Sequence, residues 1–148
     1  MTSGTTQRRI FWHAFFTLML AFAFGVVMAA QGPKGRSWLP IHLAALMEFL
    51  LLGATGAAWP FLRLGERASG AAFWFALVQN YAGIVGGSLT GVFGFPSALE
   101  GMSAWPHDWR TPVIVPILAV GDILAIGFAG LMIYGLWGST AEVPPRGP

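Results

Sequence analysis

FWHAFFTLMLAFAFGVVMAA, residues 11–30, is the stretch that decides the fold class. Its twenty residues contain one ionisable side chain, that of His13. An α-helix rises about 1.5 Å per residue, so a run of about twenty apolar residues crosses the ~30 Å hydrocarbon core of a bilayer. The stretch therefore predicts a transmembrane helix. A cleavable signal peptide is the alternative, because Arg8 and Arg9 precede the run and residues 27–29 resemble a small-residue cleavage site, but the run exceeds the usual apolar core of about 7–15 residues.

Three more apolar stretches follow, at residues 39–62, 70–93 and 111–136. Polar connections separate them, and we expect the tail at residues 139–148 to be disordered. Of the 148 residues, 55% are hydrophobic and 9% are charged, whereas soluble domains carry about 25% charged residues. We therefore predict an all-α fold, a four-transmembrane-helix bundle that forms a single membrane domain over residues 1–148.

Composition and motifs exclude several classes of function. The formal net charge is +2 and the eight Lys and Arg form no block, so nucleic acid is not an expected partner. Cysteine is absent, which excludes disulfides, thiolate metal sites and a cysteine nucleophile. The sequence also lacks a Walker loop, a dinucleotide-binding fingerprint, a Gly-x-Ser-x-Gly elbow and a His-Glu-x-x-His pair. Hydrolysis of the Ser-His-Asp type therefore has no support, and any metal must be held by His, carboxylate or thioether groups.

Basic residues in the connections indicate the orientation. Five of them fall on the side of the two termini and three on the other side, and cytoplasmic loops carry the excess of Lys and Arg. The first group is Arg8, Arg9, Arg63, Arg67 and Arg146, and the second is Lys34, Arg36 and Arg110. We therefore expect a multi-pass protein of a bacterial-type inner (cytoplasmic) membrane, with both termini in the cytoplasm.

Polar side chains within the predicted spans are candidate functional residues, because a charged group at the bilayer centre costs at least about 2.5–3.5 kcal/mol. The candidates are His13, His42, Glu48, Asn80, Tyr81 and Asp122. Placed at about 1.5 Å per residue, His42 lies near the non-cytoplasmic face and His13 near the cytoplasmic face. The other four fall into one polar layer contributed by the second, third and fourth spans, which predicts a shared site.

A structural alternative stays open for each of these four residues. Asn80 and Tyr81 could simply bond neighbouring helices. Glu48 or Asp122 could be a neutral carboxyl satisfied by a hydroxyl group, because apolar surroundings disfavour the charged form. The third span is also rich in glycine, and we expect Gly83, Gly86, Gly87 and Gly91 to form a helix-contact face.

His42 is a candidate metal or haem ligand, because imidazole is a common protein ligand for haem iron and no thiolate competes with it. A histidine at the start of a helix beside a membrane interface could also only reach toward the interface or cap the helix. Met47 points about 140° away from His42 around the helix, so we predict that it is a packing residue. Six residues turn a helix through about 600°, so His42 and Glu48 face directions about 120° apart. These two side chains cannot both face one small site unless another helix or subunit contributes to that site.

Short motifs in all four spans make the sequence similar to the hydroxylaminobenzene mutase family and its relatives, the styrene oxide isomerases. The residues that carry the resemblance are Ile41-His42-Leu43 with Glu48 six positions after the histidine, Trp59-Pro60, Leu62-Arg63-Leu64, Trp12-His13-Ala14, Ala72-Phe73-Trp74-Phe75-Ala76-Leu77, Tyr81-Ala82 and Gly121-Asp122-Ile123.

The resemblance implies a small four-span membrane isomerase that assembles as a homotrimer and holds haem b between subunits through His42. The implied chemistry is a redox-neutral rearrangement of a small apolar aromatic substrate that arrives from the lipid bilayer. The substrate would be an aryl hydroxylamine converted to an aminophenol, or an aryl epoxide converted to an aldehyde, with ferric iron as a Lewis acid. On this hypothesis Glu48, Asn80, Tyr81 and Asp122 line the catalytic pocket, and His13 is a further candidate for cofactor binding.

The sequence also departs from the resembled pattern. The family implies an asparagine where Glu48 stands, and the styrene oxide isomerases imply an aspartate and a tyrosine where Gln79 and Gly87 stand. An acid at Glu48 could bind substrate, donate a proton to a leaving oxygen, or indicate a different substrate. Two other hypotheses stay open: a haem-binding membrane electron-transfer or sensor protein, and a non-enzymatic helical subunit or carrier.

Overall fold

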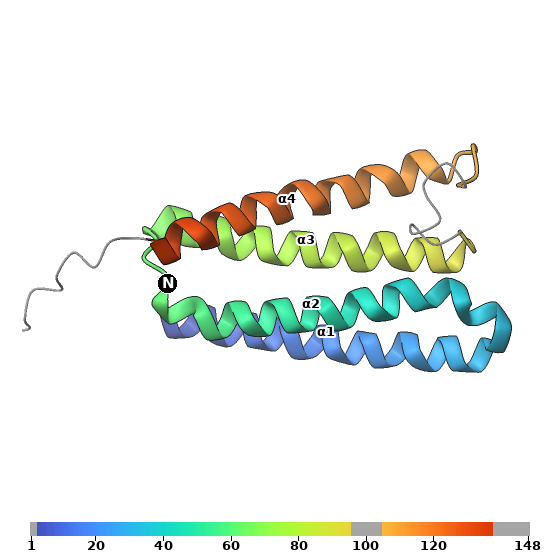
Figure 1. The fold of residues 1–148 in the computed structure, drawn as a ribbon, viewed down its shortest axis with the longest axis horizontal. Coiled ribbons are helices and arrows are strands. Elements are labelled where there is room, and N and C mark those ends of the chain that lie inside the picture. The colour runs from blue at the N-terminus through green and yellow to red at the C-terminus, as the bar shows by residue number, and fades with distance from the viewer. Residues whose placement is uncertain (1–2, 96–104, 138–148) are drawn as a thin grey trace, which may run out of the picture.

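The protein is an all-helical bundle in the computed structural model, which describes residues 3–95 and 105–137. Within these ranges, four long helices run up and down along one axis (Figure 1). They are α1 (Ser3–Gln31), α2 (Leu39–Ala58), α3 (Glu66–Val92) and α4 (Thr111–Trp137), with 3-10 helices η1 (Gly32–Trp38) and η2 (Trp59–Phe61) flanking α2. The predicted all-α four-helix bundle is confirmed.

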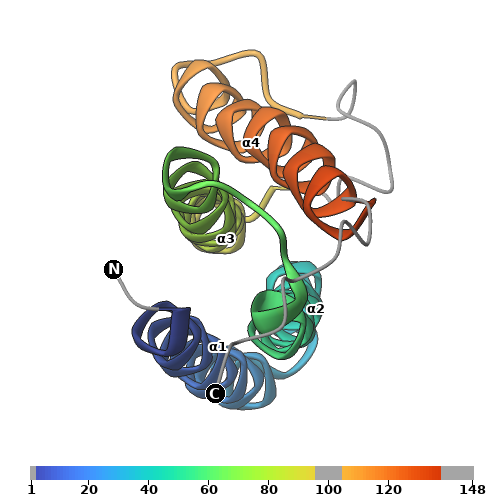
Figure 2. The same cartoon turned by 90° about the vertical axis from the view of Figure 1, so that its left-hand side faces the viewer.

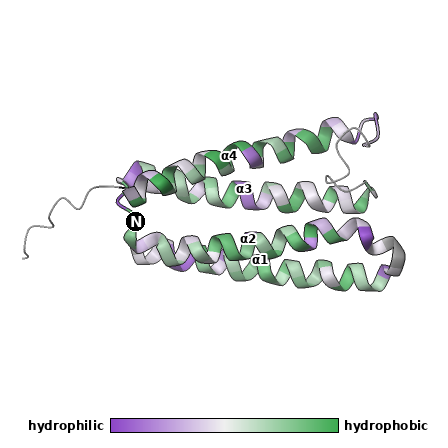
Figure 3. Cartoon of the chain, viewed as in Figure 1, coloured by the Kyte–Doolittle hydropathy of each residue, from purple (hydrophilic) through white to green (hydrophobic). Residues whose placement is uncertain are grey.

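Three segments of the described chain are long and apolar enough to cross a membrane: Gly4–Gln31, Gly35–Phe61 and Thr111–Trp137. α3 is as long as α4, at 27 residues each, but it is less apolar, and Gln79 and Asn80 lie midway along it. Both side chains are buried against neighbouring helices, so they face no lipid. Figure 3 shows hydrophobic residues along all four helices, interrupted by hydrophilic residues midway along α3 and α4.

The helices form two hairpins. α1 packs along α2 and α3 packs along α4, and α2 joins the hairpins through α3 (Figure 2). The largest apolar cluster lies toward the end of the bundle where α1 begins, and its buried members are Ile10, Ala14, Leu52, Trp59, Ala72, Phe73, Ala76, Leu77 and Phe128. The α2–α3 boundary, at mid-bundle, is where polar side chains from the two hairpins meet.

The helix boundaries differ from those predicted at three places. α1 begins at Ser3 rather than near residue 11, because its first turns are docked on α2, where the Gln7 Nε2 donates to the carbonyl oxygen of Gly56 at 2.9 Å. α2 ends at Ala58 instead of residue 62, since Pro60 lacks the N–H that an α-helix needs there. α3 begins at Glu66, four residues before the expected start. The predicted disordered tail lies outside the described residues.

The connection between α3 and α4 is anchored where it is described. Trp105 is 4% exposed and packs its ring edge-on against Phe95, and the Arg110 guanidinium lies 5.4 Å from the centroid of the Phe95 ring. Hydrogen bonds from Arg110 hold the pKa of the Asp108 carboxyl below its ordinary value, so Asp108 stays charged at neutral pH. This ion pair and the aromatic cluster fix the entry to α4.

Glycines on α3 let its neighbours approach closely, as predicted. A Cβ added at Gly87 would lie 2.6 Å from the Cδ1 of Ile41 on α2, and one at Gly86 would lie 2.5 Å from the Cδ2 of Leu118 on α4. At separations this short, Ile41 or Leu118 would have to shift to admit a side chain. Gly86 and Gly87 therefore set the spacing of α3 from α4 and from α2.

We expect Gly87→Leu to lower the free energy of unfolding by about 1–3 kcal/mol, because the new side chain must displace the stiff, β-branched Ile41. The matched control is Gly130→Leu, since a Cβ there meets no heavy atom of the described chain within 4 Å. The measurement is the unfolding midpoint in mixed detergent micelles. Equal midpoints for the two variants would show that Gly87 does not set the α2–α3 spacing.

Candidate functional site

A carboxyl–amide pair links α2 to α3 at mid-bundle. The Nε2 of Gln79 donates to the Oε2 of Glu48 at 3.0 Å. Gln79 is only 5% exposed and Glu48 is partly buried, so water competes little for this hydrogen bond. Glu48 was predicted as a site residue and Gln79 was not, although Gln79 stands beside Asn80 in the same polar interruption of the third span.

The second oxygen of Glu48 lies beside Gly83, which carries no side chain. A Cβ built at Gly83 would lie 4.0 Å from the Glu48 Oε1, an ordinary contact distance, and apart from the nearby backbone of α3 no other heavy atom of the described residues comes as near to that Cβ. Gly83 follows Gln79 by four residues, which places both on nearly the same face of α3. α3 therefore binds one oxygen of Glu48 and leaves room beside the other.

A second polar pair links α1 to α3. The Nδ1 of His13 and the hydroxyl oxygen of Tyr81 are 2.7 Å apart, and the two rings meet edge to face with centroids 5.7 Å apart. Both side chains are partly buried. The sequence placed these residues at different depths, so it did not predict this contact.

Asn80 continues this α1–α3 connection. It is 0% exposed, and its Nδ2 donates to the Oγ1 of Thr17 at 3.2 Å, while Thr17 donates to the carbonyl oxygen of His13. The Asn80 Oδ1 has no partner within the described part of the chain. Asn80 and Tyr81 thus make the helix-bridging contacts of the structural alternative, and their catalytic role stays a prediction.

Asp122 lies apart from the other members of the predicted polar layer, of which Glu48 contacts Gln79 whereas Asn80 and Tyr81 contact α1. Its neighbour Gly121 faces α3, since a Cβ there would lie 3.5 Å from the carbonyl oxygen of Gln79. Successive helix residues are about 100° apart, so Asp122 points away from α3, and it is exposed on the surface of this chain. The predicted depth agrees with the structure, Asp122 does not face Glu48 within one chain, and its catalytic role stays a prediction.

His42 lies near the start of α2 with its ring against α1. Its Nδ1 is 2.8 Å from the carbonyl oxygen of Ala21, and a carbonyl only accepts, so Nδ1 carries the hydrogen. The Nε2 lone pair is then left without a partner among residues 3–95 and 105–137. A Cβ at Gly25 would lie 3.1 Å from the His42 Cε1, so the ring rests directly on the backbone of α1.

This donor set fits haem better than a bare metal ion. No group of three or more His, Asp or Glu side chains in the described ranges could hold an ion. Haem iron needs one axial imidazole, oriented by a hydrogen bond from the other ring nitrogen, and His42 supplies that arrangement. His13 binds Tyr81 through its Nδ1 and lies on a different part of α1 from the residues that His42 contacts.

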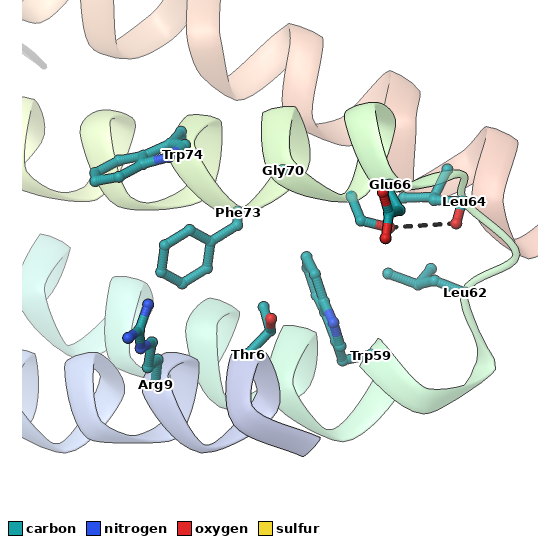
Figure 4. A pocket seen from close by; sticks show the side chains of 10 residues that line it. Thr6, Arg9, Trp59, Leu62, Leu64, Glu66, Gly70, Phe73 and Trp74 are labelled. Atoms are coloured by element: carbon teal, nitrogen blue, oxygen red, sulfur yellow. Dashed lines mark hydrogen bonds between the residues drawn. The ribbon is translucent and has the colours of Figure 1, made fainter. Parts of the chain in front are cut away.

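Two adjoining clefts separate α1 from α3. The first, of about 380 Å³, opens at the end of the bundle where α1 begins, and there Arg9 of α1 faces Phe73 of α3 (Figure 4). The second, of about 390 Å³, shares Arg9, Phe73 and Trp74 with the first and reaches His13 and Tyr81. Together they form a groove with aromatic walls that leads to the His13–Tyr81 pair. The sequence did not predict it, because its walls come from helices that are distant in the chain.

Comparisons with known proteins agree with the resemblance found in the sequence. Residues 6–137 match the family model described as styrene oxide isomerase. The chain is 34% identical over 143 residues to hydroxylaminobenzene mutase HabB of Ectopseudomonas oleovorans, an alignment that covers 91% of this chain and 85% of that relative. No solved structure matches the chain.

Proposed function

The chain belongs to the styrene oxide isomerase family and is an isomerase, and we propose that it rearranges an aryl hydroxylamine to an aminophenol with haem b held by His42. The observation that carries the substrate class is the identity to a hydroxylaminobenzene mutase across 91% of the chain. The second candidate is the rearrangement of an aryl epoxide to an aldehyde, which the name of the matching family model favours.

The geometry of His42 supports the cofactor. The hydrogen bond between Nδ1 and the Ala21 carbonyl oxygen fixes the ring, and Gly25 gives the ring room against α1. The Nε2 is the atom that would bind the iron. Ferric haem bound there would supply a Lewis acid that polarises an N–O or C–O bond without net electron transfer.

Glu48 supplies the proton in the proposed reaction. Its carboxyl donates a proton to the leaving oxygen as the N–O or C–O bond breaks, and the bonding electron pair stays on that oxygen. The carboxylate takes a proton back when the product forms, so the reaction consumes no proton and no electron. Asn80 and Tyr81 keep α1 against α3 beside the site, through Thr17 and His13.

The groove between α1 and α3 is the proposed route for the substrate. Phe73 and Trp74 offer flat apolar walls to an aromatic ring, and Arg9 stands at the mouth. Arg8, Arg63 and Arg67 are exposed at the same end of the bundle, which supports the placement of both termini in the cytoplasm of a bacterial-type inner membrane.

The proposal includes a homo-oligomer, with the trimer implied by the family resemblance. His42 contacts α1 whereas Glu48 contacts α3, so one chain directs them to different neighbours. Asp122 is exposed on α4 at the level of Gln79, and an ionisable group facing lipid at this depth is costly. A second copy that covers Asp122 removes that cost.

We expect Asp122→Leu to raise the dissociation constant of the oligomer about tenfold, since a polar contact between membrane helices contributes about 1–2 kcal/mol. Ile126→Leu is the matched control, because Ile126 is 76% exposed on the same helix and the change keeps the site apolar. Native mass spectrometry in detergent gives the populations of monomer and oligomer. An unchanged population in Asp122→Leu would place this residue outside the subunit contact.

The function is tested by incubating purified, haem-supplemented protein separately with phenylhydroxylamine and with styrene oxide. Formation of an aminophenol supports the proposal, and formation of only phenylacetaldehyde supports the second candidate. Reversible haem reduction with both axial positions filled and no turnover would favour an electron-transfer or sensor protein. A colourless protein without turnover would favour a non-enzymatic helical subunit.

A further inference from the structure

We propose that Gln79 is a positioning residue that fixes the exchangeable proton of Glu48 on Oε1, and that Gly83 keeps this oxygen accessible to the substrate. The inference rests on the proposed function, because it takes Glu48 as the proton donor. It goes beyond that function in assigning roles to two α3 residues and in naming the reacting oxygen.

The hydrogen bond distinguishes the two carboxyl oxygens. The Gln79 Nε2 only donates, so the Glu48 Oε2 at 3.0 Å must accept. A neutral carboxyl has one carbonyl oxygen and one hydroxyl oxygen, and the carbonyl oxygen is the better acceptor. The amide of Gln79 therefore places the carbonyl character on Oε2 and the hydroxyl hydrogen on Oε1.

Burial makes this arrangement persistent. Gln79 is 5% exposed, so its amide has little access to a replacement partner if the bond to Glu48 breaks. An unsatisfied buried donor costs about 1–3 kcal/mol. The Glu48 side chain is thus held in one orientation across the α2–α3 boundary.

Gly83 provides the access. It lies one turn beyond Gln79, and the position that its Cβ would occupy is 4.0 Å from Oε1, with no nearer heavy atom in the described chain apart from the nearby backbone of α3. A methyl group there would make an ordinary contact with Oε1, whereas a branched side chain would fill the space. The oxygen that carries the proton is therefore the one beside the position that has no side chain.

The proton that Glu48 donates returns to Glu48 within one reaction cycle. The Oε1–H bond breaks as the proton moves to the leaving oxygen of the substrate, and the electron pair of the cleaved N–O bond stays on that oxygen. Gln79 donates to the resulting carboxylate through Oε2. The released water forms the new C–O bond to the ring carbon, and one of its protons passes to the nitrogen. When that ring carbon loses its hydrogen as a proton, Oε1 takes the proton, and the enzyme returns to its starting state without an oxidant or reductant.

The first test combines kinetics with infrared spectroscopy on Gln79→Met, which keeps the side-chain length and removes the N–H. We expect kcat to fall about 10–100-fold with KM little changed, because a misplaced proton donor slows the chemical step more than binding. In protein without substrate, the C=O band that Glu48→Gln abolishes should move to higher frequency in Gln79→Met, since the carbonyl has lost a hydrogen bond. Haem content should not change, because Glu48 and His42 contact different helices.

The second test exchanges the two groups. The double variant Glu48→Gln with Gln79→Glu keeps one acid and one amide across the same boundary, and we expect it to recover at least tenfold in kcat over either single variant. Gly83→Leu should lose activity without loss of haem, because a branched side chain would cover Oε1.

Four results would overturn the inference: an unshifted C=O band in Gln79→Met, an unchanged kcat in Gln79→Met, a double variant no better than the singles, or full activity in Gly83→Leu. The absence of any protonated-carboxyl band assigned to Glu48 would overturn it as well. The proposed function fails differently, through a wild-type protein that rearranges neither substrate, and the infrared comparison stays informative in that case because it needs no substrate.

Discussion

His42→Ala is expected to abolish haem binding and to lower the rearrangement rate by at least about a thousandfold. The imidazole Nε2 is the proposed iron ligand, and loss of a Lewis acid that supplies several kcal/mol of transition-state stabilisation corresponds to this factor. The measurement is the Soret absorbance per chain together with turnover of the aryl hydroxylamine.

His107→Ala is the control for this variant, since His107 is an exposed histidine in the connection before α4. It should keep both haem and activity. Added imidazole should partly restore the Soret band of His42→Gly, because the cavity left by the side chain still faces the Ala21 carbonyl. Full haem content and activity in His42→Ala would refute the assignment of the ligand.

Glu48→Gln is expected to lower kcat by about 10²–10⁴-fold while the haem content stays at the wild-type level. An amide has nearly the shape of the acid but cannot donate the proton, and positioned general acids contribute this factor. Steady-state kinetics with haem quantified in the same samples separate the loss of chemistry from a loss of cofactor.

Asp108→Asn is the control, because Asp108 is an exposed acid in the connection before α4 and lines neither cleft. It should react at the wild-type rate. If Glu48→Gln also kept the wild-type kcat, the proton would have to come from another group, and the role proposed for Gln79 would fall with it.

The fold was predictable because lipid imposes a simple length and polarity requirement on each helix. The apolar runs fixed the number and order of the helices, and the glycine face of the third span indicated close packing. The first helix was the exception. Its first residues are polar and are not needed to cross a membrane, so the apolar run did not include them. Their helical structure is supported by the hydrogen bond from Gln7 to Gly56, which joins segments distant in the chain.

The depth of each site residue along its helix was predictable from the sequence, but the direction of its side chain around the helix was not. Counting residues places Glu48 and Asp122 at similar levels, and the structure agrees, since Gly121 packs beside Gln79. The direction of a side chain around its helix depends on which face packs against a neighbour. Gly121 takes the inward position on α4, so Asp122 is turned outward.

The pairing of His13 with Tyr81 escaped prediction for a related reason. The sequence placed the start of the first helix near residue 11 and therefore placed His13 close to a membrane face. α1 begins at Ser3, which moves His13 toward the middle of the helix and opposite Tyr81, 2.7 Å away.

Two departures from the resembled family pattern meet in space. The resembled family implies an asparagine at the position of Glu48, and the styrene oxide isomerases imply an aspartate at that of Gln79. In this chain the acid and the amide have exchanged places across a 3.0 Å hydrogen bond. Considered one at a time, each departure weakens the resemblance. Considered together, they retain one acid and one amide at the α2–α3 boundary.

The most direct test of the account is the rearrangement rate of wild-type protein as a function of the haem bound per chain, in preparations reconstituted to different occupancies. The account predicts a rate that rises in proportion to haem occupancy and extrapolates to zero in haem-free protein. A rate that is independent of occupancy, or a haem-free preparation with full activity, would contradict it.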